Sequence, residues 1–234
     1  MDKNKLLIAI SLLPLVASCH GVLISSSDAR KTLENINETL NEKSNDYQRF
    51  TYYYDEYHGE ENYLNKKVVY DKDAKYSYSY QVSYLHIVET WNYVVKTDND
   101  TSHILRGKRI DGKVNENGFP DVEYEWLFYS DQLWNEIETS IFSEVDELLS
   151  YSLERMEKMI NYYDIVSSDD IMFTSFNSNS LCVEGKTNDQ EFVFRVDDFL
   201  LKEMEQKIND NNYTKFTCNY ERVTINYLNI PTPN

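Results

Sequence analysis

Hydrophobic and polar residues alternate along much of the chain. In residues 75–84 (KYSYSYQVSY), four tyrosines and a valine alternate with serine and glutamine. The same period of two recurs, between short turn-like joints, in residues 47–57, 62–71, 86–97, 102–110 and 122–129. Successive side chains of a strand point to opposite faces, so this pattern predicts an antiparallel meander of about five or six strands.

Two regions have a helical period instead. Residues 25–43 open with serine and aspartate cap candidates and then repeat small and aliphatic residues on one face, which predicts an amphipathic helix of about four turns. Residues 131–162 keep the same period, and Ser130 is a suitable N-cap. Ser143, with Asp146 three residues later, also fits a helix start, so this region is either one helix or a broken pair.

The C-terminal third returns to strands. Residues 171–176, 181–187, 191–197 and 213–227 are rich in β-branched and aromatic residues, and the last strand changes phase near residues 221–222, which indicates a bulge. Residues 199–209 have helical propensities, but the short connections on both sides favour a strand. The fold class that follows is α+β: one large, curved antiparallel sheet with helices packed on one face. The 234 residues suit a single domain over residues 26–234.

The N-terminus resembles a bacterial lipoprotein signal. Lys3 and Lys5 precede an apolar run of about 13 residues, too short to span a bilayer and typical of a signal peptide. The run ends in Val-Ala-Ser-Cys at 16–19, which is similar to a lipobox. The resemblance implies that residues 1–18 are cleaved and that Cys19 is lipidated. Residues 19–25 would then tether the domain to the extracytoplasmic side of the cell membrane. The alternative is an ordinary secretory signal or a buried helix, with Cys19 incidental.

The net charge of −17 narrows the possible partners. A field of that sign repels nucleic-acid phosphates and anionic lipid headgroups. Nucleic-acid binding is therefore excluded, and membrane attachment has to come from acyl chains on Cys19 and not from basic residues.

A lipobox, an N-terminal amphipathic helix and a long meander interrupted by helices together resemble the LolA-like lipoprotein-carrier superfamily, which includes the LppX-type lipid-binding lipoproteins. The resemblance is architectural and covers most of residues 25–234. It implies a half-barrel whose concave face is covered by helices and encloses a cavity for acyl chains. No ligand residue carries over position by position.

Aromatic residues on neighbouring strands are the candidate ligand-binding residues. If the strands register as their order suggests, one sheet face collects Tyr76, Tyr78, Tyr80, Trp91, Tyr93, Tyr124 and Trp126. Two interpretations stay open. The face is the core between sheet and helices, or part of it is uncovered and binds an apolar or sugar-like ligand.

Motifs for catalysis or metal binding are missing from the sequence. The four histidines have no zinc-type spacing, and we find no nucleophile elbow, phosphate loop or dinucleotide fingerprint. We therefore expect no enzyme, no metal and no cofactor. A disulfide between Cys182 and Cys218 is not expected, because two strands separate theirs in a simple meander; both should be buried free thiols.

The function expected from these features is a membrane-anchored lipoprotein that works as a binding module for a lipid or other amphiphile, or for a protein partner in the envelope. The alternative is a surface structural or adhesion lipoprotein with a fully packed core and no ligand cavity.

Overall fold

The computed structural model describes residues 21–43, 49–59, 63–84, 87–96, 102–114 and 120–219. The signal segment, Cys19 and the phase change near residues 221–222 lie outside the described residues. The first half comprises β1 (Val22–Leu23), α2 (Ser26–Lys43), β2 (Arg49–His58), β3 (Tyr63–Asp71), β4 (Tyr76–Ser83), β5 (Ile87–Lys96), β6 (Ser102–Val114) and β7 (Pro120–Phe128). The second half comprises α3 (Asp131–Val166), β8 (Ile171–Ser175), β9 (Leu181–Lys186), β10 (Glu191–Asp197), β11 (Leu200–Asn209) and β12 (Asn212–Asn219).

The described strands form one open, 12-stranded antiparallel sheet, as the sequence predicted in outline. The strand order is β1-β8-β9-β10-β11-β12-β2-β3-β4-β5-β6-β7. Two meanders, β2–β7 and β8–β12, are joined where β12 pairs with β2, from Asn212 opposite His58 to Asn219 opposite Thr51. This non-local pairing brings the last described strand to the middle of the sheet.

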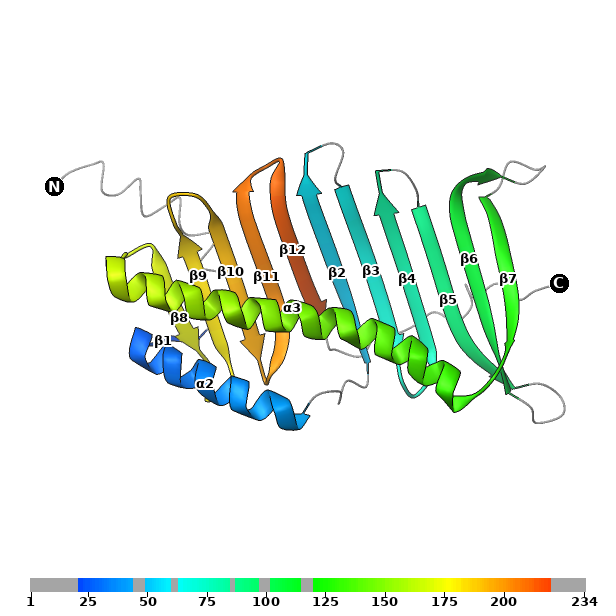
Figure 1. Ribbon diagram of the computed structural model, residues 1–234, viewed down its shortest axis with the longest axis horizontal. Coiled ribbons are helices and arrows are strands. Elements are labelled where there is room, and N and C mark those ends of the chain that lie inside the picture. The colour runs from blue at the N-terminus through cyan, green and yellow to red at the C-terminus, as the bar shows by residue number, and fades with distance from the viewer. Residues whose placement is uncertain are drawn as a thin grey trace.

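Helix α3 carries the chain back across the sheet. From β7 to β8 the sheet has ten inter-strand gaps, a width of roughly 48 Å at the usual strand spacing. The 36 residues of α3 correspond to a length of roughly 54 Å. One unbroken helix therefore spans the crossover, and Figure 1 shows it lying across the strands on one side of the sheet.

Local residues set both ends of α3 and the start of α2. The Ser130 hydroxyl accepts from the Leu133 amide at 3.1 Å, and α3 ends at Ser167, whose backbone is left-handed. The Ser25 hydroxyl accepts from the Asp28 amide at 3.1 Å at the start of α2. The broken-pair alternative for residues 131–162 is wrong, because Ser143 lies inside α3.

The hydrophobic core lies between the helices and the β8–β12 end of the sheet. Both helices lie on the same sheet face (Figure 1), with α2 against β8 and β9 and α3 against β10 and β11. Their buried residues meet the inward rows of β2 and β8–β12. The largest fully buried side chains there are Phe50, Tyr52, Phe192, Phe194, Phe216, Leu181, Leu201, Met156 and Ile160.

Two strand predictions are settled by the structure. Residues 199–209 are a strand, as expected, because Leu200–Asn209 pairs with both β10 and β12. The strands predicted over 102–110 and 122–129 are longer on their facing ends, since β6 continues to Val114 and β7 begins at Pro120.

Candidate functional site: a polar cleft beneath helix α3

The half of the sheet from β3 to β6 presents polar residues to α3. Strand register aligns Ser77 with Asn92 and Asn92 with Arg106, which makes one row across β4, β5 and β6. A second row runs through Ser79, Thr90 and Lys108. Since register partners share a face, all six side chains lie on the α3 side of the sheet.

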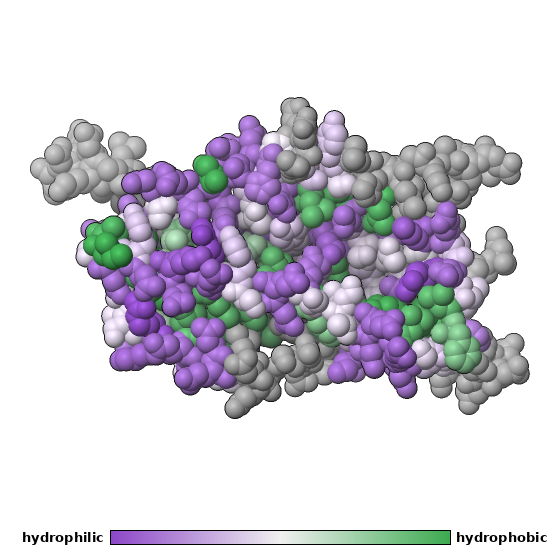
Figure 2. All heavy atoms as spheres, viewed as in Figure 1, coloured by the Kyte–Doolittle hydropathy of each residue, from purple (hydrophilic) through white to green (hydrophobic). Residues whose placement is uncertain are grey.

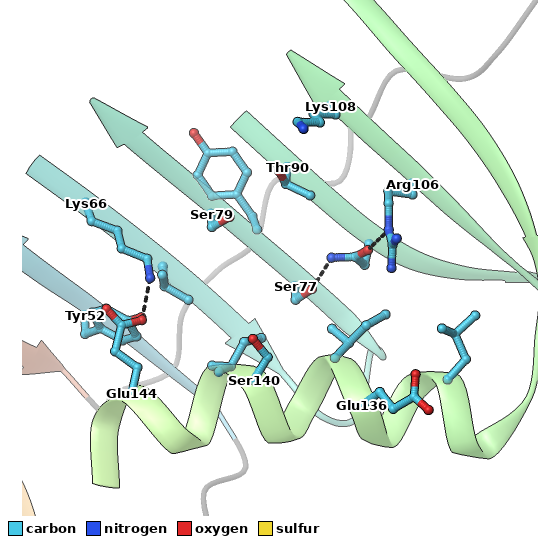
Figure 3. Close-up of a pocket in the computed structure, with 16 residues that line it drawn as sticks. Tyr52, Lys66, Ser77, Ser79, Thr90, Arg106, Lys108, Glu136, Ser140 and Glu144 are labelled. Carbon is cyan, nitrogen blue, oxygen red and sulfur yellow. Dashed lines mark hydrogen bonds and ion pairs between the residues drawn. The ribbon is translucent and has the colours of Figure 1, made fainter. Parts of the chain in front are cut away.

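A cleft of about 590 Å³ separates these rows from α3 (Figure 3). The sheet contributes Tyr52, Lys66, Val68, Ser77, Tyr78, Ser79, Thr90, Asn92, Arg106 and Lys108, and α3 contributes Leu133, Glu136, Ile137, Ser140, Ile141 and Glu144. The volume lies within the usual range for small-molecule sites. Figure 2 shows the helix-bearing face of the protein as mainly hydrophilic, with small hydrophobic patches.

A chain of hydrogen bonds orients Arg106 on the sheet side of the cleft. The Arg106 Nε donates to Asn92 Oδ1 at 2.9 Å, and Asn92 Nδ2 donates to Ser77 Oγ at 3.0 Å. Asn92 and Ser77 are buried, so their positions are held by the sheet. The remaining guanidinium donors of Arg106 are not used by this chain of bonds.

The opposite end of the cleft is closed by a charged cluster. Glu144 on α3 accepts from the Tyr52 hydroxyl and from the Lys66 ammonium group. Burial, followed by the charge of Glu144, raises the pKa of Tyr52 far above its ordinary value. Tyr70 donates in the same way to Glu138, and burial with that hydrogen bond raises its pKa as well. These contacts fasten the middle of α3 to β2 and β3.

The α3 side of the cleft carries an apolar stripe next to the polar residues Glu136, Ser140 and Glu144. Leu133, Ile137 and Ile141 recur one helical turn apart and are half-buried. Val68 continues this apolar surface on β3. The cleft is therefore amphipathic, with an apolar wall on the helix and a polar, partly cationic floor on the sheet.

The seven aromatic candidates do share one sheet face, but it is the face turned away from the helices. Tyr76 aligns with Tyr93, and Tyr78 aligns with Trp91, which leads through Gly107 to Tyr124. These residues alternate with the cleft-lining serine, asparagine and arginine, so they point to the other side. The interpretation of this face as the core beneath the helices is therefore wrong.

The contacts on the aromatic face agree with that assignment. Tyr78 borders the cleft, yet its ring lies 6.1 Å from Trp91 and its hydroxyl donates to Glu89 at 3.3 Å. A Cβ on Gly107 would lie 2.6 Å from Trp91 and 3.3 Å from Tyr124, so these rings cover that glycine. Exposure increases toward the β7 edge, from 6% for Tyr76 to 49% for Trp126. Tyr80 and Tyr93 are half-buried between these extremes.

Sequence reasoning missed the cleft residues Arg106, Lys108, Asn92 and Ser77. The alternation in β4 and β5 already contained these residues. Where aromatic side chains occupy every second position, hydroxyl and amide side chains occupy the positions between them. The polar phase is the one that α3 covers.

The two cysteines of the described chain differ. Cys218 on β12 is a buried thiol that forms no disulfide, whereas Cys182 on β9 is disulfide-bonded. They are not joined to each other, and β10 and β11 separate their strands, as expected. The expectation of a free thiol is wrong for Cys182.

Among the described residues, neither helix is long and apolar enough to cross a membrane. Within the same ranges, no three histidine, cysteine or acidic side chains gather in a way that suits a metal ion.

Compared with protein-family models, curated proteins and solved structures, the chain matches none of them.

Proposed function

We propose that the protein is an extracytoplasmic lipoprotein, anchored to the cell membrane by acyl chains on Cys19, that binds a lipid or other amphiphile in the α3 cleft. The observation that carries the proposal is the cleft of about 590 Å³ with an apolar wall and a polar floor. A site with two such sides suits a ligand that has both an apolar and a polar part.

The shape of the sheet belongs to the same proposal. We take the open sheet to be a half-barrel with the helices on its concave side. Two features support this: both helices lie on one face, and among the described strands the sheet ends at β1 and β7 rather than closing.

Binding rather than catalysis is the proposed activity. The carboxylates of the cleft already have structural partners: Glu144 accepts from Tyr52 and Lys66, and Glu136 accepts from Gln132 at 3.2 Å. Carboxylates with these partners hold the walls of the pocket in place, which fits a binding site better than a site for proton transfer.

A structural or adhesion role is the alternative. It requires dense packing between sheet and helices, and the β8–β12 end has that packing. The cleft at the other end of α3 favours the binding proposal.

Occupancy of the cleft tests the proposal. Purified protein should release an amphiphile when analysed by native mass spectrometry. Ile137→Trp, which fills the cleft, should remove this amphiphile while the protein stays folded. Glu157→Trp is the matched control, because it adds the same ring at an exposed position of α3. Equal loading of both variants would exclude the cleft, and repeated absence of any amphiphile would favour the structural alternative.

The anchor needs a separate test. Cys19→Ser should leave the protein unacylated and release it from membranes. The mass of the native protein with and without reductant also tests the acylation of Cys19. A sulfur that carries a lipid thioether cannot form a disulfide. Membrane retention of Cys19→Ser would contradict the lipobox interpretation.

An envelope protein partner is the second candidate, and the aromatic face favours it. Tyr124, Trp126 and Phe128 on the edge strand β7 are exposed by 38%, 49% and 75%. Exposed aromatic clusters of this kind are typical of protein interfaces. A Trp126→Ser/Phe128→Ser variant should lose cross-linking to such a partner and keep amphiphile binding. Unchanged cross-linking would exclude this face.

A further inference from the structure

The charge of the cleft is opposite to that of the protein. The whole chain has a net charge of −17. The cleft is lined by three cationic side chains (Lys66, Arg106 and Lys108) and two carboxylates (Glu136 and Glu144), so its formal charge is +1. A positive lining in so acidic a protein calls for an explanation.

The cations differ in how they are used. Lys66 is paired with Glu144 and belongs to the cluster that holds α3. Within the part of the chain that the structure describes, Arg106 and Lys108 form no ion pair, and Arg106 has its hydrogen bond to Asn92. Two positive charges therefore face the cleft without a carboxylate bound to them.

The acidic residues nearest in register leave this conclusion intact. Glu125 is aligned with Arg106, and Glu123 with Lys108, on the neighbouring strand β7. Both glutamates are exposed, and water weakens the field of an exposed charge. Glu136, on the α3 side, accepts from Gln132. These groups reduce the local potential without occupying the cations.

Arg106 is held ready for a ligand. Its Nε is held by Asn92, which in turn is held by Ser77, and Figure 3 shows its guanidinium group lying between the sheet and α3. A guanidinium fixed through one nitrogen presents its other donors as a fork, which matches the oxygens of a carboxylate or phosphate.

We propose that the cleft binds an amphiphilic anion. Its carboxylate or phosphate contacts Arg106, assisted by Lys108, and its apolar part lies along Leu133, Ile137 and Ile141. The inference rests on the proposed function and specifies the ligand class and the binding residues of the same site.

The test compares three probes by titration calorimetry. Dodecyl phosphate and the neutral dodecyl maltoside are used below their critical micelle concentrations, and inorganic phosphate is the third probe. Dodecyl phosphate should bind most tightly. Arg106→Gln should weaken it about tenfold, the effect of losing one charge-assisted contact, and Lys108→Gln about threefold. Dodecyl maltoside should bind both variants as it binds the wild type.

Lys158→Gln is the control for net charge, since Lys158 is an exposed residue near the C-terminal end of α3, paired with Glu154. It should leave the affinity for dodecyl phosphate unchanged. If Arg106→Gln does not fold, as judged by circular dichroism, Lys108→Gln decides the outcome, because Lys108 is exposed and holds no other side chain.

Each contrary result has its own meaning. Equal affinity for dodecyl phosphate and dodecyl maltoside, unaffected by Arg106→Gln and Lys108→Gln, would overturn the anion site and leave amphiphile binding in place. Binding of inorganic phosphate as tight as that of dodecyl phosphate would show a site for free oxyanions and overturn the amphiphile assignment. No binding of either amphiphile would overturn the proposed function itself.

Discussion

The two ends of the sheet present different surfaces to the same helix, one apolar and one polar. Under the C-terminal half of α3, the inward rows of β9–β12 carry valine, phenylalanine, leucine and methionine, and helix residues such as Leu149, Met156 and Ile160 are buried. Under the N-terminal half, β4–β6 offer serine, threonine, asparagine, arginine and lysine, and Leu133, Ile137 and Ile141 are only half-buried. Trp134 and Val145 on the helix and Ile104 on β6 are the buried exceptions in that half.

The difference comes from the strands and not from the helix. Aliphatic residues follow a 3.6 period along most of α3, so the helix offers an apolar stripe to both ends of the sheet. At the packed end the strands complete a core against this stripe. At the open end the strands turn their aromatic residues to the other face and leave a cleft. The core thus supplies the stability, and the cleft is available for a ligand.

The largest effect should come from removing an aromatic residue of the packed end. Phe194 on β10 is 1% exposed, and Phe194→Ala should lower the free energy of unfolding by about 3–5 kcal/mol, through lost burial and the cavity left behind. Urea denaturation followed by circular dichroism measures the change.

Phe128→Ala at the edge of the open end is the matched control. The same side chain is removed, but Phe128 is 75% exposed, so the change should stay within about 0.5 kcal/mol. Similar losses for both variants would contradict the division into a packed and an open end.

Glycines provide the second comparison. A Cβ on Gly185, whose φ is +155°, would lie 2.1 Å from the carbonyl oxygen of Asp170, which is backbone. A Cβ on Gly107 would meet the Trp91 side chain at 2.6 Å. Gly185→Ala should cost about 3 kcal/mol, because backbone of the packed end has to move, and Gly107→Ala about 1 kcal/mol, because a side chain can turn aside.

Thermal unfolding measures both glycine variants, and tryptophan fluorescence separates them. Gly107→Ala should change the emission spectrum through Trp91, whereas Gly185→Ala should leave the spectrum of the folded protein unchanged. A greater loss of stability for Gly107→Ala would indicate that the aromatic face is packed as rigidly as the core.

How far the sequence predicts this molecule depends on whether a feature is local. The positions of the described strands, the Ser130 cap and the sharing of one face by Tyr76, Tyr78 and Trp91 follow from periods within short segments, and the structure confirms them, although β6 and β7 extend beyond their predicted limits. The pairing of β12 with β2 is non-local, and so is the side on which α3 lies. A period of two divides side chains between two faces but does not say which face a distant helix covers. For that reason Ser77 and Arg106 were not recognised as cleft residues.

Alkaline pH should weaken the contacts at the boundary between the two ends. Burial and carboxylate partners raise the pKa of Tyr52, Tyr54 and Tyr70, and a hydrogen bond to Asp55 with burial raises that of Tyr213 to about 12. The folded protein therefore keeps phenolic protons that the unfolded chain releases near pH 10. Stability should be unaffected below about pH 10 and should fall as the pH rises through 10 to 12 and beyond.

Phenolate absorbance and urea denaturation at several pH values measure this effect. Tyr52→Phe/Tyr70→Phe should show a shallower decline, because two of the raised groups are gone. A double variant that declines as steeply as the wild type would show that the contacts of Tyr52 and Tyr70 with α3 do not carry the pH dependence.

Truncation of the apolar wall of the cleft should cost little stability for a residue of the helix. Ile137 is half-buried and faces polar strands across an open space. Ile137→Ala removes contacts on one side only, so it should cost less than about 1.5 kcal/mol, below the usual 2–5 kcal/mol for a buried isoleucine. Ile160→Ala is the comparison and should fall in that higher range. Ile160 lies about six turns further along the same helix and is fully buried. If Ile137→Ala lowers the free energy of unfolding as much as Ile160→Ala does, the cleft is closed in solution and the open end is a second core. A small loss of stability together with weaker binding of dodecyl phosphate would place Ile137 in the ligand site and outside the core.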